Sequence, residues 1–175
     1  VRLRIQTALD MSDVHLGDSI ATNGICLTVI DFGTDWYAVD VSRESLHRTT
    51  LGSWKIGQPV NVEKAMLPTT RFGGHIVSGH VDAVTTIQDV LTEAGSLQLF
   101  VRIPPSLRGF IAPKGSITIN GVSLTVNHVS EGVFQVNLIP ITQQKTNLGL
   151  LRIGSLVNIE IDMLARYLAN YLKGH

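Results

Sequence analysis

The chain has 175 residues, of which 44% are hydrophobic and 16% are charged, and its 14 basic residues balance its 14 acidic ones. This composition predicts a chain with a packed core rather than a disordered one, and the zero net charge disfavours a protein that grips nucleic acid by its phosphates. No apolar run approaches the roughly 20 residues that cross a bilayer, so no membrane span is expected. Cys26 is the single cysteine. An intrachain disulfide is therefore excluded, which fits a reducing compartment such as the cytoplasm.

The first predicted element is a strand over residues 1–5, in which Val, Leu and Ile alternate with Arg. The sequence enters this strand at once, without an initial methionine. We therefore expect residues to be missing before Val1.

The two halves of the chain are copies of each other. Shifting the sequence by 97 positions superimposes residues 19–29 on residues 116–126, and both stretches read Ser-Ile-x-x-Asn-Gly-x-Cys/Ser-Leu-Thr-Val. The match continues without a gap, and 16 of the 45 aligned pairs over residues 19–63 are identical. This is far more than chance would give and indicates a duplicated domain.

The copies differ at their front ends. About twenty residues, 79–98, precede the second copy's equivalent of Val1, and they include a strand-like stretch at 80–87. The first copy has no counterpart to this stretch. Because a barrel that lacks one strand exposes two edges, we expect that the sequence is cut short.

Within each copy the pattern predicts short β-strands. In the first copy, residues 25–30, 36–41 and 58–64 are rich in Val, Ile, Tyr and Thr. Turn signals separate the strands, at Asn23-Gly24, 33–35, Asn120-Gly121 and 130–132. Many short strands at regular spacing are typical of a small barrel.

Cys26 in the first copy corresponds to Ser123 in the second, and Thr28 and Thr125 share the strand faces of these two residues. A buried cysteine is usually a small apolar filler. If this face looks into a pocket instead, each copy offers two small polar groups at the same place.

Polar residues recur after a strand in both copies, at 40–45 and 137–142, and each stretch contains a hydroxyl, on Ser45 or Thr142. One interpretation is the capping of a short helix that starts there. The other is a polar rim that binds hydroxyl and amide groups of a small ligand.

The segment 73–82, which joins the two copies, contains three glycines and two of the six histidines. If it is a strand, the spacing of five residues puts His75 and His80 on opposite faces, so no shared metal ion is expected. Glycine allows the backbone to approach a ligand closely, and histidine suits proton transfer near neutral pH. The alternative is a tight junction in which both rings make ordinary hydrogen bonds.

A helix is predicted over residues 163–173, with Asp162 as its N-cap. Leu164, Leu168 and Tyr171 share one face, with Tyr167 and Leu172 beside it. This apolar stripe either docks on the chain's own barrel or joins copies of the chain.

These features resemble the riboflavin synthase alpha-chain family. The resemblance rests on the paired motifs, on the linking Gly-Gly-His-x-Val-x-Gly-His-Val-Asp and on the Val-Asn-Ile-Glu-Ile-Asp before the last helix. It implies an all-β fold of two tandem six-stranded Greek-key β-barrels plus a C-terminal α-helix, with domains at 1–78, 79–161 and 162–175. Family members begin with a short Met-Phe-Thr-Gly-Ile-type segment that forms the first strand and contributes to a ligand site, and it is absent here.

The resemblance also implies a transferase reaction that uses no cofactor and no metal. Two molecules of 6,7-dimethyl-8-ribityllumazine dismutate by transfer of a four-carbon unit, giving riboflavin and 5-amino-6-ribitylaminouracil. It further implies a cytoplasmic homotrimer assembled through the C-terminal helices, and it leaves open an association with lumazine synthase.

Site residues carried over by motif position fall into two groups. The first ligand site would be lined by Cys26, Leu27, Thr28, Asp40, Val41, Ser42, Arg43, Glu44, Ser45, Gly79, His80 and Val81. The second would be lined by Lys114, Ser123, Leu124, Thr125, Asn137, Leu138, Ile139, Pro140, Ile141 and Thr142. His80 is the expected proton-transfer residue, and the supporting candidates for nucleophile, orienting group or base are Ser19, Cys26, Ser123, Thr125 and Asp162.

Two other functions remain open. Lumazine proteins resemble this family but hold a lumazine or flavin as a chromophore without converting it. A pair of barrels that is only structural would bind no pteridine tightly.

Overall fold

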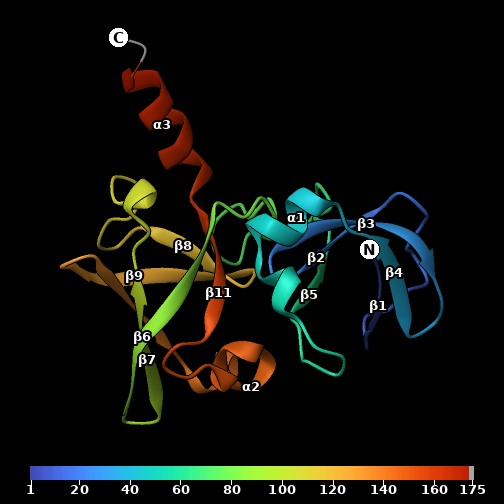
Figure 1. Ribbon diagram of the computed structural model, residues 1–175, viewed down its shortest axis with the longest axis horizontal. Helices are drawn as coiled ribbons and strands as arrows, with labels where there is room; N and C mark the ends of the chain where they lie inside the picture. The colour runs from blue at the N-terminus through green and yellow to red at the C-terminus, as the bar shows by residue number, and fades with distance from the viewer. Residues whose placement is uncertain (174–175) are drawn as a thin grey trace.

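The computed structural model describes residues 1–173 and confirms an all-β fold with a C-terminal helix (Figure 1). The first half contains five strands and one short α-helix, namely β1 (Arg2–Gln6), β2 (Ser19–Thr22), β3 (Ile25–Phe32), β4 (Trp36–Asp40), α1 (Arg43–Arg48) and β5 (Val62–Lys64). The second half contains six strands and one short α-helix, namely β6 (Ala83–Glu93), β7 (Ser96–Arg102), β8 (Ser116–Ile119), β9 (Val122–Ser130), β10 (Val133–Leu138), α2 (Pro140–Lys145) and β11 (Leu156–Ile161). Three 3-10 turns lie at Thr50–Ser53, Pro105–Leu107 and Asn147–Leu150. The last element is α3 (Met163–Lys173), and residues 174 and 175 of the predicted terminal domain lie outside the described residues.

The second half closes into a six-stranded barrel. Its strand order is β10-β7-β6-β11-β8-β9, so neighbours in space are often distant in sequence, as in a Greek key. Strand β6 closes the barrel because it pairs with β7 on one side and with β11 on the other.

The first half forms a five-stranded sheet in the order β1-β4-β3-β2-β5. Strands β1 and β5 correspond in the repeat to β7 and β11, the two strands that β6 joins in the second half. No strand of residues 1–173 lies between β1 and β5, so they are the two edges of this sheet. The domain boundaries at 78 and 161 stay a prediction.

Both predicted Asn-Gly dipeptides form tight turns. Asn23 and Gly24, and likewise Asn120 and Gly121, have positive φ angles between 48° and 84°, which suits a two-residue hairpin turn. The two turns also touch each other, because a Cβ placed on Gly24 would lie 2.5 Å from the backbone nitrogen of Gly121. Only glycine allows the two halves to approach this closely.

Each half has its own core, and the strands supply alternate residues to it. Along β3, Ile25, Leu27 and Val29 are buried, while the residues between them face outward. The cores differ at two repeated positions that lie in contact. Tyr37 is fully buried in the first half and hydrogen-bonds Thr22 at 2.6 Å, whereas Phe134 and Ile119 occupy the corresponding places in the second half.

Asparagine side chains join the two halves. In one set of contacts, the buried amide of Asn158 donates to the backbone oxygen of Asn23 at 2.9 Å and accepts from the backbone nitrogen of Thr50 at 2.8 Å. Asn158 lies on β11, and both of its partners lie in the first half. A side chain of the second half therefore provides hydrogen-bond partners for buried backbone groups of the first half.

The repeat generates a second set of contacts in the opposite direction. Asn61, the counterpart of Asn158, donates to the backbone oxygen of Asn120 at 2.9 Å and accepts from the backbone nitrogen of Asn147 at 2.7 Å. Because both partners are the repeat equivalents of the residues that Asn158 contacts, the junction has approximate two-fold symmetry.

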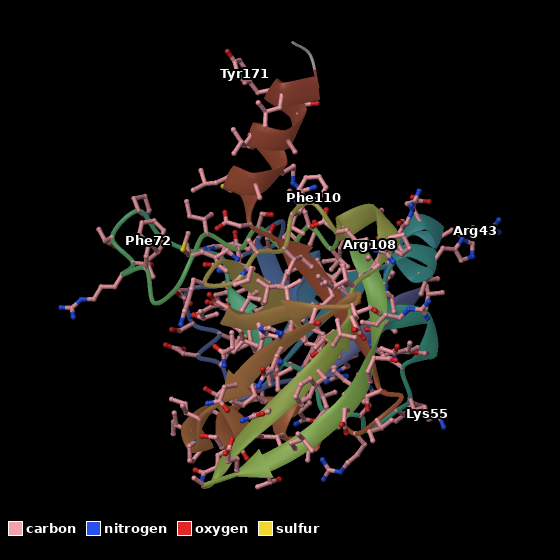
Figure 2. All side chains as sticks on the ribbon, turned by 90° about the vertical axis from the view of Figure 1, so that its left-hand side faces the viewer. Arg43, Lys55, Phe72, Arg108, Phe110 and Tyr171 are labelled. Atoms are coloured by element: carbon pink, nitrogen blue, oxygen red, sulfur yellow. The ribbon has the colours of Figure 1, made fainter. Side chains whose placement is uncertain are left out.

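Helix α3 stands away from the barrel in Figure 1 and Figure 2. The predicted cap is confirmed, since an Asp162 oxygen accepts from the backbone nitrogen of Leu164 at 3.0 Å. The apolar stripe is exposed, and Leu168 keeps 60% of its surface accessible. The interpretation that the stripe docks on the chain's own barrel is therefore wrong. No helix within residues 1–173 has the length and apolar character needed to cross a membrane.

Candidate functional site

The two halves present equivalent polar faces on the outside of their sheets. In the first half, Ser19 pairs with Thr28, and Ala21 pairs with Cys26, across β2 and β3. Because side chains alternate along a strand, Cys26 and Thr28 both point away from the core and are exposed. The predicted sharing of one face by these two residues is confirmed.

The second half repeats this arrangement. Ser116 pairs with Thr125, and Thr118 pairs with Ser123, across β8 and β9. Thr125 is exposed and Ser123 is half-buried. The face of the first half therefore carries a thiol and hydroxyls, whereas the corresponding face of the second half carries only hydroxyls.

The segment that joins the halves crosses both faces. Gly79 is buried, and its backbone oxygen accepts from the backbone nitrogen of Cys26 at 2.9 Å. A Cβ at Gly79 would lie 2.7 Å from the Cβ of Cys26, so a larger residue would force the two segments apart. The glycine therefore allows a close backbone contact within the chain, and the expected approach of this segment to a ligand stays a prediction.

The same segment meets the second face through a histidine side chain. His75 Nδ1 lies 2.7 Å from Ser123 Oγ, and His75 Nε2 lies 3.1 Å from Thr118 Oγ1. A Cβ at Gly74 would lie 2.2 Å from Ser123 Oγ. One imidazole therefore bridges two hydroxyls of the second half.

The prediction that this segment is a strand is wrong. Residues 65–82 form no strand, because their backbone makes only isolated hydrogen bonds to strands of the two halves, such as Gly79 to Cys26 and Asp82 to Ile159, and not a continuous ladder. His75 and His80 consequently lie where individual contacts hold them rather than on alternate faces of a sheet. His75 is at the second face, whereas His80 is exposed and directly follows the glycine that contacts Cys26.

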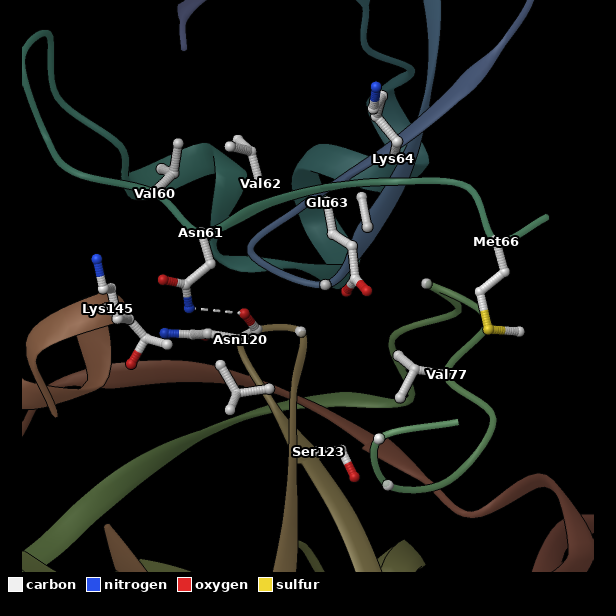
Figure 3. A pocket seen from close by; sticks show the side chains of 18 of the residues that line it. Val60, Asn61, Val62, Glu63, Lys64, Met66, Val77, Asn120, Ser123 and Lys145 are labelled. Carbon is white, nitrogen blue, oxygen red and sulfur yellow. Dashed lines mark hydrogen bonds between the residues drawn. The ribbon is translucent and has the colours of Figure 1, made fainter. Parts of the chain in front are cut away.

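A cleft of about 950 Å³ lies between the halves (Figure 3). Four of the predicted site residues line it, namely Ser19, Cys26, Gly79 and Ser123. Its size is in the range that holds a small organic ligand. The cleft therefore brings one representative group from each repeated face to a common space.

The charged residues of the cleft were not identified from the sequence. Glu63, Lys64 and Lys145 line it, and His75 reaches Ser123 beside it. The repeat contained one signal, since Val-Asn-x-Glu recurs at 60–63 and 157–160. This signal marks Glu63 but does not reveal that it lines one cleft together with Lys145 of the second half.

Other predicted residues of the first site surround the outer face. Asp40 is exposed at the end of β4, where two hydrogen bonds of 3.1 Å from Arg2 hold the pKa of its carboxyl below its usual range. Ser42 caps α1, because its Oγ accepts from the backbone nitrogen of Ser45 at 3.0 Å. The helix-cap interpretation of this stretch is thus confirmed, and a role as a polar rim is compatible with it.

Some residues of the first group cannot offer their side chains to a ligand at this face. Leu27 and Val41 are buried in the first core, so only their backbone groups are available. Arg43 and Glu44 are exposed on α1, and Glu44 bonds Arg48 along the helix at 2.8 Å. Val81, which directly follows His80, packs against the same core and so anchors this part of the linking segment to the first half.

The second predicted group lies around the end of β10, but the helix-cap interpretation is wrong there, because Ile139 stands at the cap position of α2 and has no side-chain acceptor. Asn137 is half-buried there, and Leu138 is buried in the second core. Ile139 and Ile141 are exposed around the start of α2, beside Pro140 and the half-buried Thr142. The remaining two residues differ, because Lys114 is exposed in the turn before β8, whereas Leu124 packs against the second core.

The fold and the cleft define a duplicated all-β protein, with a five-stranded sheet and a closed barrel that present equivalent polar faces. Residues 1–65 and 78–162 match the family model of the lumazine binding domain. Riboflavin synthase of Photobacterium phosphoreum is 49% identical over 94% of this chain and 75% of its own length. The enzymes of Bacillus subtilis and Schizosaccharomyces pombe are 44% and 39% identical, over 97% and 99% of this chain and 79% and 84% of their own lengths. The chain belongs to the riboflavin synthase family of lumazine-binding-domain proteins.

Solved structures of the protein LumP have the same fold. LumP complexed with 6,7-dimethyl-8-(1'-D-ribityl) lumazine is 28% identical, with a TM-score of 0.81 over 91% of this chain and 86% of LumP. LumP complexed with riboflavin is also 28% identical, with a TM-score of 0.84 over 91% of this chain and 87% of LumP. The expected resemblance and the duplicated lumazine-binding architecture are therefore confirmed.

Proposed function

We propose that this chain is a riboflavin synthase. It binds two molecules of 6,7-dimethyl-8-ribityllumazine and transfers a four-carbon unit from one to the other, which yields riboflavin and 5-amino-6-ribitylaminouracil. All atoms of the two substrates reappear in the two products, so the reaction balances without an external oxidant or reductant. The observation that carries the proposal is the pair of matching polar faces, Cys26 with Thr28 and Ser123 with Thr125, in a chain 49% identical to a riboflavin synthase.

A duplicated site suits a reaction between two copies of one molecule. Holding both reactants in a fixed orientation can lower the barrier by about 7–11 kcal/mol relative to a random encounter. The two sites must nevertheless differ, because one substrate donates the four carbons and the other accepts them. The difference between Cys26 and Ser123, and the presence of His80 only beside Cys26, support such unlike roles.

His80 is the proposed proton-transfer residue at the lumazine methyl group. It is exposed, and its two neighbours Gly79 and Val81 contact the first half through Cys26 and the first core. The supporting candidates for nucleophile, orienting group or base are Ser19, Cys26, Ser123, Thr125 and Asp162. The remaining residues of both predicted groups are proposed to line the two lumazine sites.

Conversion of the lumazine tests the activity directly. Incubation of the protein with 6,7-dimethyl-8-ribityllumazine should produce riboflavin, which is followed by its absorbance. The LumP structures favour a second candidate function, a carrier that binds the lumazine without converting it. A tightly bound lumazine that remains unchanged would identify the carrier, and failure to bind any lumazine in a fluorescence titration would indicate a structural barrel pair.

The proposed assembly is a homotrimer joined through α3, which would bring the first-half face of one chain opposite the second-half barrel of a neighbour. The exposed stripe of Leu164, Leu168 and Tyr171 supports this, because large exposed apolar patches mark interaction sites. An association with lumazine synthase and a location in the cytoplasm are proposed from the resemblance alone.

Introducing a charge into the stripe tests the assembly. Leu168→Asp should dissociate trimers into single chains in sedimentation velocity, since a carboxylate would have to be buried in the helix contact. The matched control is Asn170→Asp, which adds the same charge off the stripe and should leave the trimer intact. A trimer that survives Leu168→Asp would show that α3 is not the joint.

A further inference from the structure

Glu160, near the end of β11, is a carboxylate with only 3% of its surface exposed. Its Oε1 accepts from the backbone nitrogen of Ser78 at 2.7 Å and from Ser78 Oγ at 2.6 Å, and its Oε2 accepts from the backbone nitrogen of Gly79 at 2.9 Å. Hydrogen bonds to an ionised acceptor are shorter and stronger than neutral ones. The second barrel therefore holds the two residues that immediately precede His80.

The residues that follow His80 are held as well. The Asp82 carboxylate accepts from the backbone nitrogen of Ile161 at 2.9 Å and from both terminal nitrogens of Arg166, at 2.7 and 2.9 Å. The Asp82 backbone nitrogen donates to the oxygen of Ile159 at 2.8 Å. His80 is thus the exposed residue of a short segment that is anchored on both sides.

The anchored segment also contacts the first half. The oxygen of Gly79 accepts from Cys26, and Val81 packs against the first core. A carboxylate of the second barrel consequently determines the position of a histidine at the face of the first half.

We propose that Glu160 is a positioning residue for proton transfer by His80, an inference that rests on the proposed synthase function. Its repeat counterpart Glu63 is exposed at the cleft, so the same residue type has a different environment in each half. By binding Ser78 and Gly79, Glu160 assigns the histidine to the Cys26 face rather than to the Ser123 face. It touches no reacting atom and acts only through the backbone that carries His80.

Glu160→Gln replaces one of the two acceptor oxygens by an NH2 group, which cannot accept from the donors of Ser78 or Gly79. The segment should loosen while the Cys26 and Ser123 faces remain. Because a misplacement of about 1 Å can lower a rate by roughly 100-fold, kcat for riboflavin formation should fall by about 10- to 100-fold. Lumazine affinity in a fluorescence titration should change by less than about 2-fold. Glu93→Gln is the matched control on the exposed β6–β7 hairpin and should leave both quantities unchanged.

A double-mutant cycle separates positioning from a general structural effect. If Glu160 acts through His80, then Glu160→Gln should lower kcat in the native background but by less than about 2-fold in a His80→Ala background. An equal loss in both backgrounds, or an unchanged kcat, would overturn the proposal while leaving the synthase function intact. Absence of riboflavin formation by the native chain would instead refute the function itself.

Amide hydrogen exchange gives a readout that is independent of turnover. In Glu160→Gln, peptides that cover residues 76–82 should exchange at least about 10-fold faster, whereas β7 and β10 should keep their native protection. Unchanged exchange in 76–82 would show that Glu160 does not hold the segment. If Glu160→Gln does not fold, Ser78→Ala removes one of the three bonds from the other side. It should lower kcat several-fold in the native background only, and an equal loss without His80 would again overturn the proposal.

Discussion

The two halves of this chain derive from one repeated sequence, yet the linking segment contacts them by different means. At the Cys26 face the contact is the backbone oxygen of Gly79, whereas at the Ser123 face it is the side chain of His75. The faces themselves correspond residue by residue across their strand pairs. The comparison teaches that duplication supplies two similar surfaces, and that an element outside the repeat adds to the differences between them, such as Cys26 against Ser123.

The cores show a second difference. Thr22 and Tyr37 form a buried polar pair in the first half, where the second half has the apolar pair Ile119 and Phe134. A buried hydroxyl pair is stable only while both members remain. The first core is therefore more sensitive to single substitutions and to pH than the second.

The largest expected effect compares the two histidines of the linking segment. His80→Ala should lower kcat by about 10²- to 10⁴-fold, the usual contribution of a general acid or base, with little change in lumazine affinity. His75→Ala removes the contacts to Ser123 and Thr118 and should affect turnover less. Steady-state rates and fluorescence titrations measure both. Equal losses of kcat would contradict the assignment of proton transfer to His80.

The next effect tests the symmetry of the asparagine junction. Asn158→Ala should lower the free energy of unfolding by about 3 kcal/mol, because the backbone groups of Asn23 and Thr50 would be left buried without partners. Asn61→Ala should cost only about 1 kcal/mol, since Asn61 is half-buried and water can replace it. Urea denaturation measures both variants. Equal losses would mean that the two sets of contacts are energetically equivalent.

Alkaline pH should destabilise the first half through Tyr37. Burial disfavours the phenolate and raises the pKa of Tyr37 from 10.0 to about 12. The unfolded chain ionises first, so the stability due to Tyr37 is fully present below pH 10 and is lost as the pH rises toward 12. The loss approaches about 3 kcal/mol. Denaturation at several pH values should show it in the native chain, and an identical pH dependence in Tyr37→Phe would exclude Tyr37 as the cause.

The smallest expected change in the free energy of unfolding comes from substitutions that give the first core the residue types of the second. Tyr37→Phe alone should cost about 1 kcal/mol at neutral pH, because the Thr22 hydroxyl loses its buried partner. Adding Thr22→Val should recover most of this loss, since the pair then becomes apolar as in the second half. The coupling energy from thermal or urea denaturation measures the difference. Strictly additive losses would show that the hydrogen bond does not stabilise the first core.

The local features of the fold could be predicted from the sequence because they depend on neighbouring residues. The Asn-Gly turns, the alternation along β3 and the Asp162 cap of α3 all follow from short-range backbone geometry. The repeat also indicated that Cys26 and Ser123 occupy equivalent places. These predictions needed no knowledge of how the halves meet.

The linking segment could not be predicted in the same way. Its pattern of apolar residues and glycines suggested a strand, but its hydrogen-bond partners are distant in sequence and lie in both halves, Cys26 in the first and Glu160 and Ser123 in the second. Glu160 holds it from β11, and Ser123 receives His75 from β9. No pattern within residues 73–82 encodes these partners.

The sequence alone determined the duplication, the all-β class and the two equivalent faces, because each follows from local periodicity or from direct repetition. Only the tertiary structure decided which face lies beside His80, how Asn61 and Asn158 join the halves, and that the α3 stripe is exposed. These outcomes depend on contacts between residues up to 135 positions apart. Such contacts form only when both halves have folded and packed against each other.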